Sequence, residues 1–241
     1  MLSKKQFKLI NSLKKKKYRS EYQLFLAEGI KVVEEFLLAN FKPHLIFCTG
    51  DYTNNLSING LHIISDKELK SISEFSSPNQ IIGVFKIPII DSPKNTGFSL
   101  VLDDINDPGN LGTIIRLCDW FGIEQIVCSP NTVDCYNPKV VQASMGSLSR
   151  ISIVYKDLKS MLEEDTRPIY GALLDGENVY QSELPKEAIL VLGNEANGIS
   201  NEVRNLITNQ ITIPQFGEIK KTESLNVATA TAILLSEFMR N

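Results

Sequence analysis

The run Ala188-Ile189-Leu190-Val191-Leu192-Gly193-Asn194-Glu195 decides the fold of this chain of 241 residues. Its first five residues are all apolar, which predicts a strand that is covered on both faces of a parallel sheet. Gly193 and the polar residues after it begin a loop that leads towards a helix. The same arrangement recurs in two segments, Asn110-Leu111-Gly112-Thr113-Ile114-Ile115-Arg116 and Ile213-Pro214 followed by Ser224-Leu225-Asn226-Val227-Ala228. Because the ligand-binding loops of an open α/β sheet gather at the carboxyl ends of its strands, the three segments predict one site.

Strand-like and helical patterns alternate through the second part of the chain. The apolar runs are residues 98–102, 125–129, 151–155, 169–173, 188–192 and 210–213, and the helical patterns are residues 111–121, 138–148, 158–164, 200–206 and 225–239. Repeated strand–helix units predict an α/β fold with a parallel sheet and helices on both of its faces.

The first part of the chain predicts a smaller α/β unit. Helical patterns cover residues 3–18, 27–40 and 66–73, and short strands are expected at residues 44–48, 62–64 and 81–86. Residues 87–97 contain proline, asparagine, serine and glycine, which is typical of a linker. We therefore predict two domains, residues 1–93 and residues 94–241.

Composition excludes several classes of protein. With 43% hydrophobic and 22% charged residues the chain is an ordinary globular protein. No apolar stretch reaches the roughly 18 residues that a membrane span needs, and the N-terminus lacks the apolar core of a signal peptide, so we expect a cytoplasmic protein. The four cysteines form no CxxC pair and the chain has two histidines, so we expect buried thiols and no metal site.

Positive charge is concentrated at the N-terminus. Met1–Ser20 holds eight lysines and arginines and no acidic residue, although the whole chain has a net charge of −3. Such a block attracts phosphate backbones, and a solvated helix face is the alternative. The candidate RNA-binding residues are Lys14, Lys15, Lys16, Lys17 and Arg19.

The segment that contains Arg116 predicts a phosphate contact at the start of a helix. Pro108-Gly109 makes a turn, Asn110 suits a helix N-cap, and an arginine guanidinium can grip a phosphate with two hydrogen bonds. The alternative is a salt bridge from Arg116 to Asp103, Asp104 or Asp119. Because acidic residues at such a turn commonly cap helices, they do not predict a metal site.

The other two segments add polar groups and a glycine. Gly193 would let a ring or ribose lie against the backbone, and Glu195 could accept ribose hydroxyls, whereas an exposed glutamate in a plain turn is the alternative. Ser224 is a natural N-cap of the last helix, and Asn226 can offer its amide to a ligand. The glycine spacing is not that of a dinucleotide fingerprint, and no Ser–His–Asp set can be built in this part.

These segments resemble the three motifs of the SpoU family of RNA 2′-O-ribose methyltransferases in the SPOUT (α/β-knot) superfamily. The resemblance rests on Asn110, Gly112 and Arg116, on Leu192-Gly193-Asn194-Glu195, and on Ile213-Pro214 with Ser224-Leu225-Asn226-Val227. Residues 139–147 are similar to a stretch that the family carries between the first two motifs. Residues 25–29 and the basic helix before them resemble the ribosomal-protein-like RNA-binding domain that often precedes the catalytic domain. Residues 218–223 make the last loop longer than the family's usual spacing.

The resemblance implies a deep trefoil knot near the C-terminus, bound S-adenosylmethionine and a homodimer that modifies ribosomal or transfer RNA. It places Leu192, Gly193, Ile213 and Leu225 against the cofactor, largely through backbone groups. It also makes Arg116 the residue that acts on the target ribose, helping to deprotonate its 2′-hydroxyl with the assistance of the RNA phosphate. Asn110 would hold or orient this arginine, and Glu195, Ser224 and Asn226 would complete the polar site.

Two alternatives stay open from the sequence. A SPOUT enzyme that methylates a base would need an acidic general base in place of the asparagine and arginine, and none is seen. A non-catalytic RNA-binding or ribosome-assembly protein with the same fold would bind RNA without the cofactor.

Overall fold

The computed structural model describes residues 1–50, 52, 60–89, 96–217 and 224–240 and divides them into two compact units. The first unit is built from Met1–Ile89 and Asp134–Ser149, and the second from Ile90–Val133 and Arg150–Asn241. The predicted domain boundary near residue 93 had left the segment Asp134–Ser149 in the second domain, whereas its contacts are with the first unit. Residues 90–95 of the predicted linker and the long loop 218–223 lie outside the described residues.

The first unit is a four-stranded mixed sheet with helices on both faces. Its sheet has the order β1-β4-β2-β3, in which β4 is antiparallel to β1 and β2, and β3 is parallel to β2. Its elements are α1 (Lys4–Leu13), α2 (Lys16–Tyr22), β1 (Leu24–Glu28), α3 (Ile30–Leu38), β2 (Pro43–Cys48), β3 (Leu61–Ile63), α4 (Asp66–Ile72), β4 (Ile81–Lys86), α6 (Pro138–Ala143) and the 3-10 turn η1 (Ser147–Ser149).

Two predictions for this unit were wrong in detail. The basic helix expected over residues 3–18 is two helices, because Lys15 has an extended backbone and forms the N-cap of α2. The helix expected from residue 27 begins at Ile30, and the residues before it form the buried strand β1. Gly29 separates the two elements with a φ of 90°, a conformation that favours glycine.

An aromatic cluster joins the inserted segment to the first unit. The ring of Tyr136 lies 4.6 Å from that of Phe25, which also contacts the rings of Phe36 and Phe85. Phe25, Phe36 and Phe85 are fully buried. The hydrophobic contacts of these side chains therefore hold residues 134–149 against β1 and α3.

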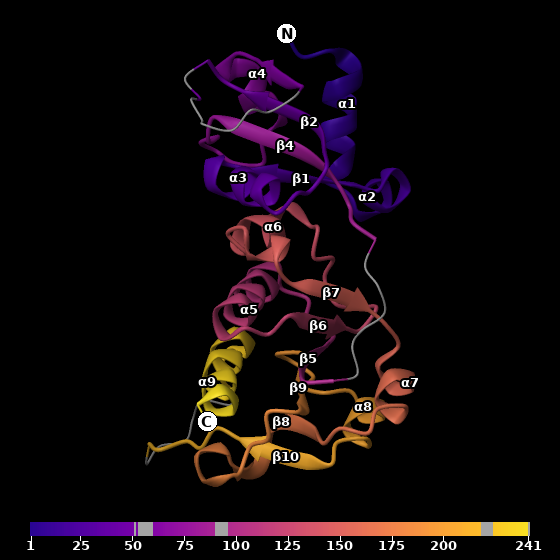
Figure 1. Cartoon of the computed structure of the whole chain (residues 1–241), viewed down its shortest axis with the longest axis vertical. Coiled ribbons are helices and arrows are strands. Elements are labelled where there is room, and N and C mark those ends of the chain that lie inside the picture. The colour runs from indigo at the N-terminus through magenta and orange to yellow at the C-terminus, as the bar shows by residue number, and fades with distance from the viewer. Residues whose placement is uncertain (51, 53–59, 90–95, 218–223, 241) are drawn as a thin grey trace. The chain divides into compact units, whose positions relative to one another are not determined.

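The second unit is an all-parallel sheet of six strands in the order β10-β8-β9-β5-β6-β7 (Figure 1). This confirms the predicted fold class. Its strands are β5 (Phe98–Asp103), β6 (Gln125–Cys128), β7 (Ser152–Tyr155), β8 (Ile169–Asn178), β9 (Ala188–Gly193) and β10 (Asn209–Thr212). Its helices are α5 (Pro108–Phe121), α7 (Leu158–Glu163), the 3-10 turn η2 (Val179–Gln181), α8 (Asn201–Arg204) and α9 (Val227–Met239).

Alternate residues of the central strands face two layers of helices. Val101, Ile189 and Val191 pack with apolar side chains of α7 and α8, and the residues between them face the other side. Figure 1 shows α5 and α9 on that other side, where they pack against each other. Burial on both faces explains why these strands are apolar throughout. Since all six strands are parallel, their carboxyl ends lie along one edge of the sheet.

Candidate active site

A chain of hydrogen bonds joins one residue from each of the three motif segments. The Asn226 amide nitrogen donates to the Asn110 side-chain oxygen at 2.9 Å. The Asn110 amide nitrogen in turn donates to Glu195 Oε1 at 2.5 Å. Asn110 lies in the first turn of α5, Glu195 follows β9, and Asn226 precedes α9. The predicted convergence of the three segments at one edge of the sheet is therefore confirmed, and we call these three residues the polar trio.

The helix caps differ from the prediction, and one of them is a member of the polar trio. The N-cap of α5 is Asp107, whose carboxylate accepts a hydrogen bond from the Asn110 backbone N–H at 2.8 Å. The N-cap of α9 is Asn226, whose side-chain oxygen accepts hydrogen bonds from the N–H groups of Ala228 and Thr229. The predicted caps, Asn110 and Ser224, were therefore wrong. Asn226 uses its oxygen for the helix and its nitrogen for Asn110, so the start of α9 fixes the orientation of the trio.

Gly193 is required because the chain folds back on itself at the end of β9. The N–H of Asn194 donates to the carbonyl of Gly198 at 3.0 Å, and the N–H of Gly198 donates back to the carbonyl of Asn194 at 2.8 Å. A Cβ atom on Gly193 would lie 2.3 Å from the backbone of Gly198 and Ile199. The loop that contains Glu195 is therefore a tight backbone structure that admits only glycine at this position.

Asn194 and Asp103 hold this loop in place, and the sequence analysis had missed both roles. The Asn194 amide donates to the Asp104 carbonyl at 2.8 Å, while its oxygen accepts from two N–H groups of its own turn. Asp103 is buried and accepts a hydrogen bond from the Ser200 N–H at 2.8 Å. The role of Asn194 could have been predicted from the sequence, because asparagine side chains often hydrogen-bond the backbone of their own turn. The acidic run therefore organises backbone, and the described residues hold no cluster of metal-ligating side chains.

Arg116 is exposed on α5 and makes no hydrogen bond or ion pair with any residue that the structure describes. The alternative of a salt bridge to Asp119 is not what the structure shows, because Asp119 pairs with Arg150 at 2.8 Å. Arg116 also makes no hydrogen bond to the polar trio. Its guanidinium is thus available to a ligand such as a phosphate, and its predicted role stays a prediction.

The predicted cofactor contacts surround the same carboxyl ends. Leu192 and Gly193 end β9, Ile213 directly follows β10, and Leu225 precedes α9. Leu192 is buried, Gly193 and Ile213 are half-buried, and Leu225 is exposed, as is Ser224. A ligand at this edge would meet backbone at the ends of β9 and β10 and before α9, beside the Glu195 carboxylate.

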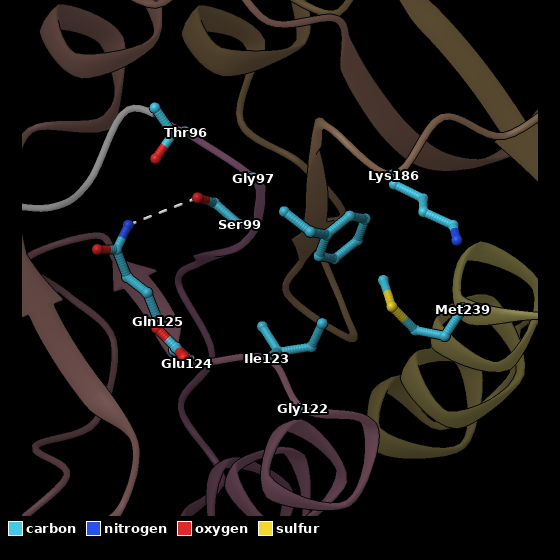
Figure 2. A pocket seen from close by; sticks show the side chains of 10 residues that line it. Thr96, Gly97, Ser99, Gly122, Ile123, Glu124, Gln125, Lys186 and Met239 are labelled. Carbon is cyan, nitrogen blue, oxygen red and sulfur yellow. Dashed lines mark hydrogen bonds between the residues drawn. The ribbon is translucent and has the colours of Figure 1, made fainter.

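The pocket of about 330 Å³ in this unit lies at the other end of the sheet. It is formed by the amino ends of β5 and β6 and the end of α9 (Figure 2). The side chains around it belong to Thr96, Gly97, Phe98, Ser99, Gly122, Ile123, Glu124, Gln125, Lys186 and Met239. None of the predicted site residues lines it.

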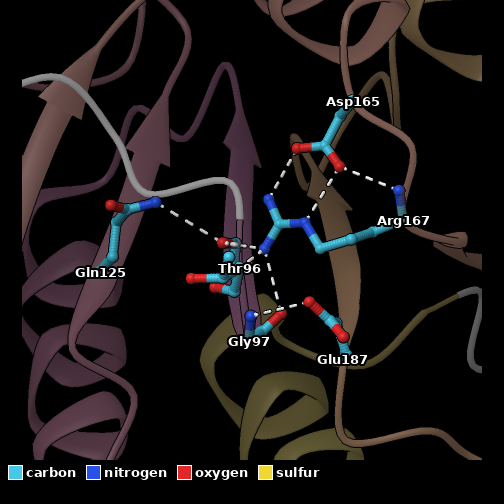
Figure 3. A network of polar contacts seen from close by, with 7 residues as sticks. Thr96, Gly97, Gln125, Asp165, Arg167 and Glu187 are labelled. Atoms are coloured by element: carbon cyan, nitrogen blue, oxygen red, sulfur yellow. Dashed lines mark hydrogen bonds and ion pairs between the residues drawn. The ribbon is translucent and has the colours of Figure 1, made fainter.

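A buried ion pair stabilises that same amino end. Arg167 pairs with Asp165 at 2.7 Å and also donates to Ser99 Oγ and the Gly97 carbonyl (Figure 3). The hydrogen bonds from Arg167 hold the pKa of the Asp165 carboxyl below its ordinary value. This network ties the residues before β8 to the start of β5 and is structural.

The predicted RNA-binding cations of the first unit fall into two groups. Arg19 is 2% exposed and is bound to Asp134, and Lys14 pairs with Glu74 at 2.6 Å. Their charges are neutralised within the fold. Lys15, Lys16 and Lys17 are exposed at the start of α2. The surface that the charge block predicts is therefore reduced to these three and the exposed lysines of α1.

Comparison with known proteins gives matches along almost the whole chain. Residues 97–236 match the model of the SpoU rRNA Methylase family, and residues 4–83 match the MRM3-like substrate binding domain. The chain is 31% identical over 228 residues to the 23S rRNA (guanosine(2553)-2′-O)-methyltransferase RlmP of Bacillus subtilis, covering 91% of this chain and 90% of that protein.

Solved structures agree along the full length. A TrmH-family protein from Porphyromonas gingivalis is 40% identical, with a TM-score of 0.92 over 100% of this chain and 99% of that one. An AdoMet-bound rRNA methyltransferase from Sinorhizobium meliloti is 27% identical, with a TM-score of 0.86 over 100% of this chain and 96% of the other.

Proposed function

Because the chain belongs to the SpoU rRNA methylase family, we propose that it transfers a methyl group from S-adenosylmethionine to a ribose 2′-hydroxyl of ribosomal or transfer RNA. The observation that carries this proposal is the polar trio. Its hydrogen bonds bring residues from three distant segments to one edge of the sheet, beside the glycine-dependent loop at Gly193. The relatives named as 2′-O-methyltransferases of 23S rRNA support the same activity.

The residues at this edge fit S-adenosylmethionine. Leu225 is exposed and Gly193 and Ile213 are half-buried, so their backbone groups would hydrogen-bond an adenine or amino-acid group. Glu195 is exposed, and its carboxylate would accept hydrogen bonds from ribose hydroxyls. The buried Leu192 would support the ligand through the backbone of β9. When bound, the cofactor supplies an electrophilic methyl group on a sulfonium. No metal ion is needed for that chemistry.

Arg116 would act on the RNA and not on the cofactor. An arginine guanidinium stays protonated in proteins, so stabilising the forming 2′-oxygen anion or holding the adjacent phosphate suits it better than accepting the proton. Asn110 is hydrogen-bonded to both Asn226 and Glu195, so its role would be to position these two side chains. Ser224 is exposed two residues before Asn226 and would add a hydroxyl to the polar site. Alignment of reacting groups can supply roughly 7–11 kcal/mol of the barrier.

The first unit would select the RNA. Its match to a substrate-binding domain supports this role, and Lys15, Lys16 and Lys17 offer an exposed positive surface. Since each neutralised phosphate releases counterions, binding through these lysines should weaken with salt.

The assembly, knot and location are parts of the same proposal. We expect a homodimer, and Trp120 supports it because this large apolar side chain on α5 is 84% exposed in the single chain. We also expect a trefoil knot near the C-terminus, and membership of the SpoU family supports this expectation. The cytoplasm is the expected location from the proposed RNA substrate, and the described residues contain no helix long and apolar enough to cross a membrane.

Calorimetric titration of S-adenosylmethionine tests the proposal, with Gly193→Trp and Gly217→Trp as a matched pair. Gly193 is enclosed by backbone, whereas a Cβ at Gly217 meets no atom of the described residues within 4 Å. We expect the wild type and Gly217→Trp to bind and Gly193→Trp to lose binding. A folded wild type that releases no heat, even with RNA present, would instead support a non-catalytic RNA-binding protein.

A further inference from the structure

Two aromatic rings stand exposed at the carboxyl edge of the second unit. Tyr180 is 40% exposed and Phe216 is 82% exposed. Their rings are stacked, with centroids 6.3 Å apart and planes inclined by 30°. Tyr180 comes from η2 and Phe216 from the loop after β10, so two separate segments bring them together. Large apolar surface left in water at a functional edge often marks a binding surface.

The protein holds Tyr180 in this outward position. The Asn178 side chain accepts a hydrogen bond from the Tyr180 N–H at 3.0 Å, and Ser182 donates to the Asn178 carbonyl at 3.0 Å. Val179, the neighbouring residue, is fully buried. The turn is therefore anchored on one side while the tyrosine ring is presented to solvent on the other.

Strand register places the pair at the same edge as the polar trio. Asn178 at the end of β8 is paired with Thr212 at the end of β10, so Tyr180 and Phe216 both follow the carboxyl ends of neighbouring parallel strands. The next strand after β8 in the sheet is β9, which leads into Glu195. In addition, α9 packs against η2, and α9 is the helix that Asn226 caps.

We propose that Tyr180 and Phe216 form a stacking platform for an unpaired base of the RNA substrate, beside the ribose that is methylated. This inference rests on the proposed function. Every nucleobase has a π face, so stacking on aromatic side chains binds single-stranded RNA with little dependence on its sequence. The platform would hold a base next to the target while the trio and Arg116 act on the sugar and phosphate.

The test uses a short single-stranded RNA with one central 2-aminopurine, whose fluorescence is quenched when the base stacks. The variants are Tyr180→Ala and Phe216→Ala, with Phe216→Tyr as the conservative replacement. Leu174→Ala is the matched control, because Leu174 is a 74% exposed apolar residue of β8 without a ring. We expect the wild type to quench the probe. Each of the two alanine variants, which lacks one ring, should raise the dissociation constant by about 5- to 150-fold. Phe216→Tyr and Leu174→Ala should bind as the wild type does.

Other measurements on the same variants separate the alternatives. If Phe216→Ala loses S-adenosylmethionine binding in calorimetry, or changes its oligomeric state in gel filtration, the pair contacts the cofactor or another subunit, and the platform is refuted. A wild type that binds the probe without quenching, or does not bind it, also refutes the platform. These results leave the proposed function standing as long as the wild type binds S-adenosylmethionine and methylates RNA.

Discussion

Arg19 and Lys15 lie four residues apart in the basic N-terminus, and the structure predicts opposite consequences of replacing them by methionine. The Arg19 guanidinium is buried, contacts Asp134 at 2.6 and 2.8 Å and donates to the Leu13 carbonyl at 2.9 Å. Lys15 is exposed. Arg19→Met leaves a largely buried Asp134 carboxylate without its partner, which costs about 3–5 kcal/mol in comparable cases.

This cost is large against a total stability of about 5–15 kcal/mol. At a urea dependence of about 2 kcal/mol per molar, the unfolding midpoint of Arg19→Met should fall by about 1.5–2.5 M. A second substitution, Asp134→Asn, removes the unpaired charge but keeps an acceptor for the Tyr136 N–H. The double variant should therefore recover part of the lost stability.

The assay combines urea unfolding with RNA binding measured by fluorescence anisotropy over a range of salt concentrations. Lys15→Met should unfold like the wild type but bind RNA more weakly, with a salt dependence reduced by about 0.7–0.9 in the log–log slope. Folded Arg19→Met should keep the wild-type salt dependence. The reasoning is refuted if Arg19→Met unfolds at the wild-type midpoint, or if it lowers the salt slope as Lys15→Met is expected to do.

The other predictions concern the second unit. Gly193→Ala should lower stability by about 1–3 kcal/mol, because its Cβ would overlap backbone, while Gly217→Ala should unfold like the wild type in the same melt. Arg116→Ala removes a group that would stabilise the forming 2′-oxygen anion, so it should lower kcat by roughly 10²–10³-fold in steady-state kinetics and leave the S-adenosylmethionine affinity unchanged in calorimetry. An equal loss of kcat and of cofactor affinity would contradict its role on RNA. Because Arg167 lowers the pKa of Asp165 in the folded state, this pair's stabilisation is complete above the ordinary pKa of 3.8 and is lost as the pH falls through the lowered value. Urea midpoints should therefore show a large gap between wild type and Asp165→Asn at neutral pH, narrowing in acid, and a gap that stays constant with pH would show that the ionised pair is not its source.

The sheet of the second unit could be predicted because its local signals agree with its tertiary structure. The strand at residues 188–192 is apolar throughout, as burial on both faces requires, and the structure gives β9 there. Helices α5 and α9 were also predicted, but their N-cap residues were predicted wrongly. Asp107 and Asn110 lie close in sequence, as do Ser224 and Asn226, and each of these side chains can cap a helix. Which one of a pair becomes the N-cap depends on contacts beyond the segment.

Distant pairing is the part that the sequence could not reveal. Strand β1 depends on antiparallel pairing with β4, which lies more than fifty residues further along the chain. The position of Tyr136 in the first unit depends on its contact with Phe25. Likewise, composition marked Asn110 and Glu195 as polar candidates, whereas their hydrogen bond spans 85 positions. The strand–loop pattern predicted that both residues lie at the carboxyl edge of the sheet, but it did not predict their hydrogen bond.

Incubation of the purified protein with S-adenosylmethionine carrying an isotopically labelled methyl group tests the central claim most directly. The acceptors are ribosomal and transfer RNA isolated from cells that lack this protein, and the digested nucleosides are analysed by mass spectrometry. The account predicts label in a 2′-O-methylribonucleoside, and Arg116→Ala should reduce it strongly. Label on a base, or no label in either RNA with a folded wild type, would contradict it.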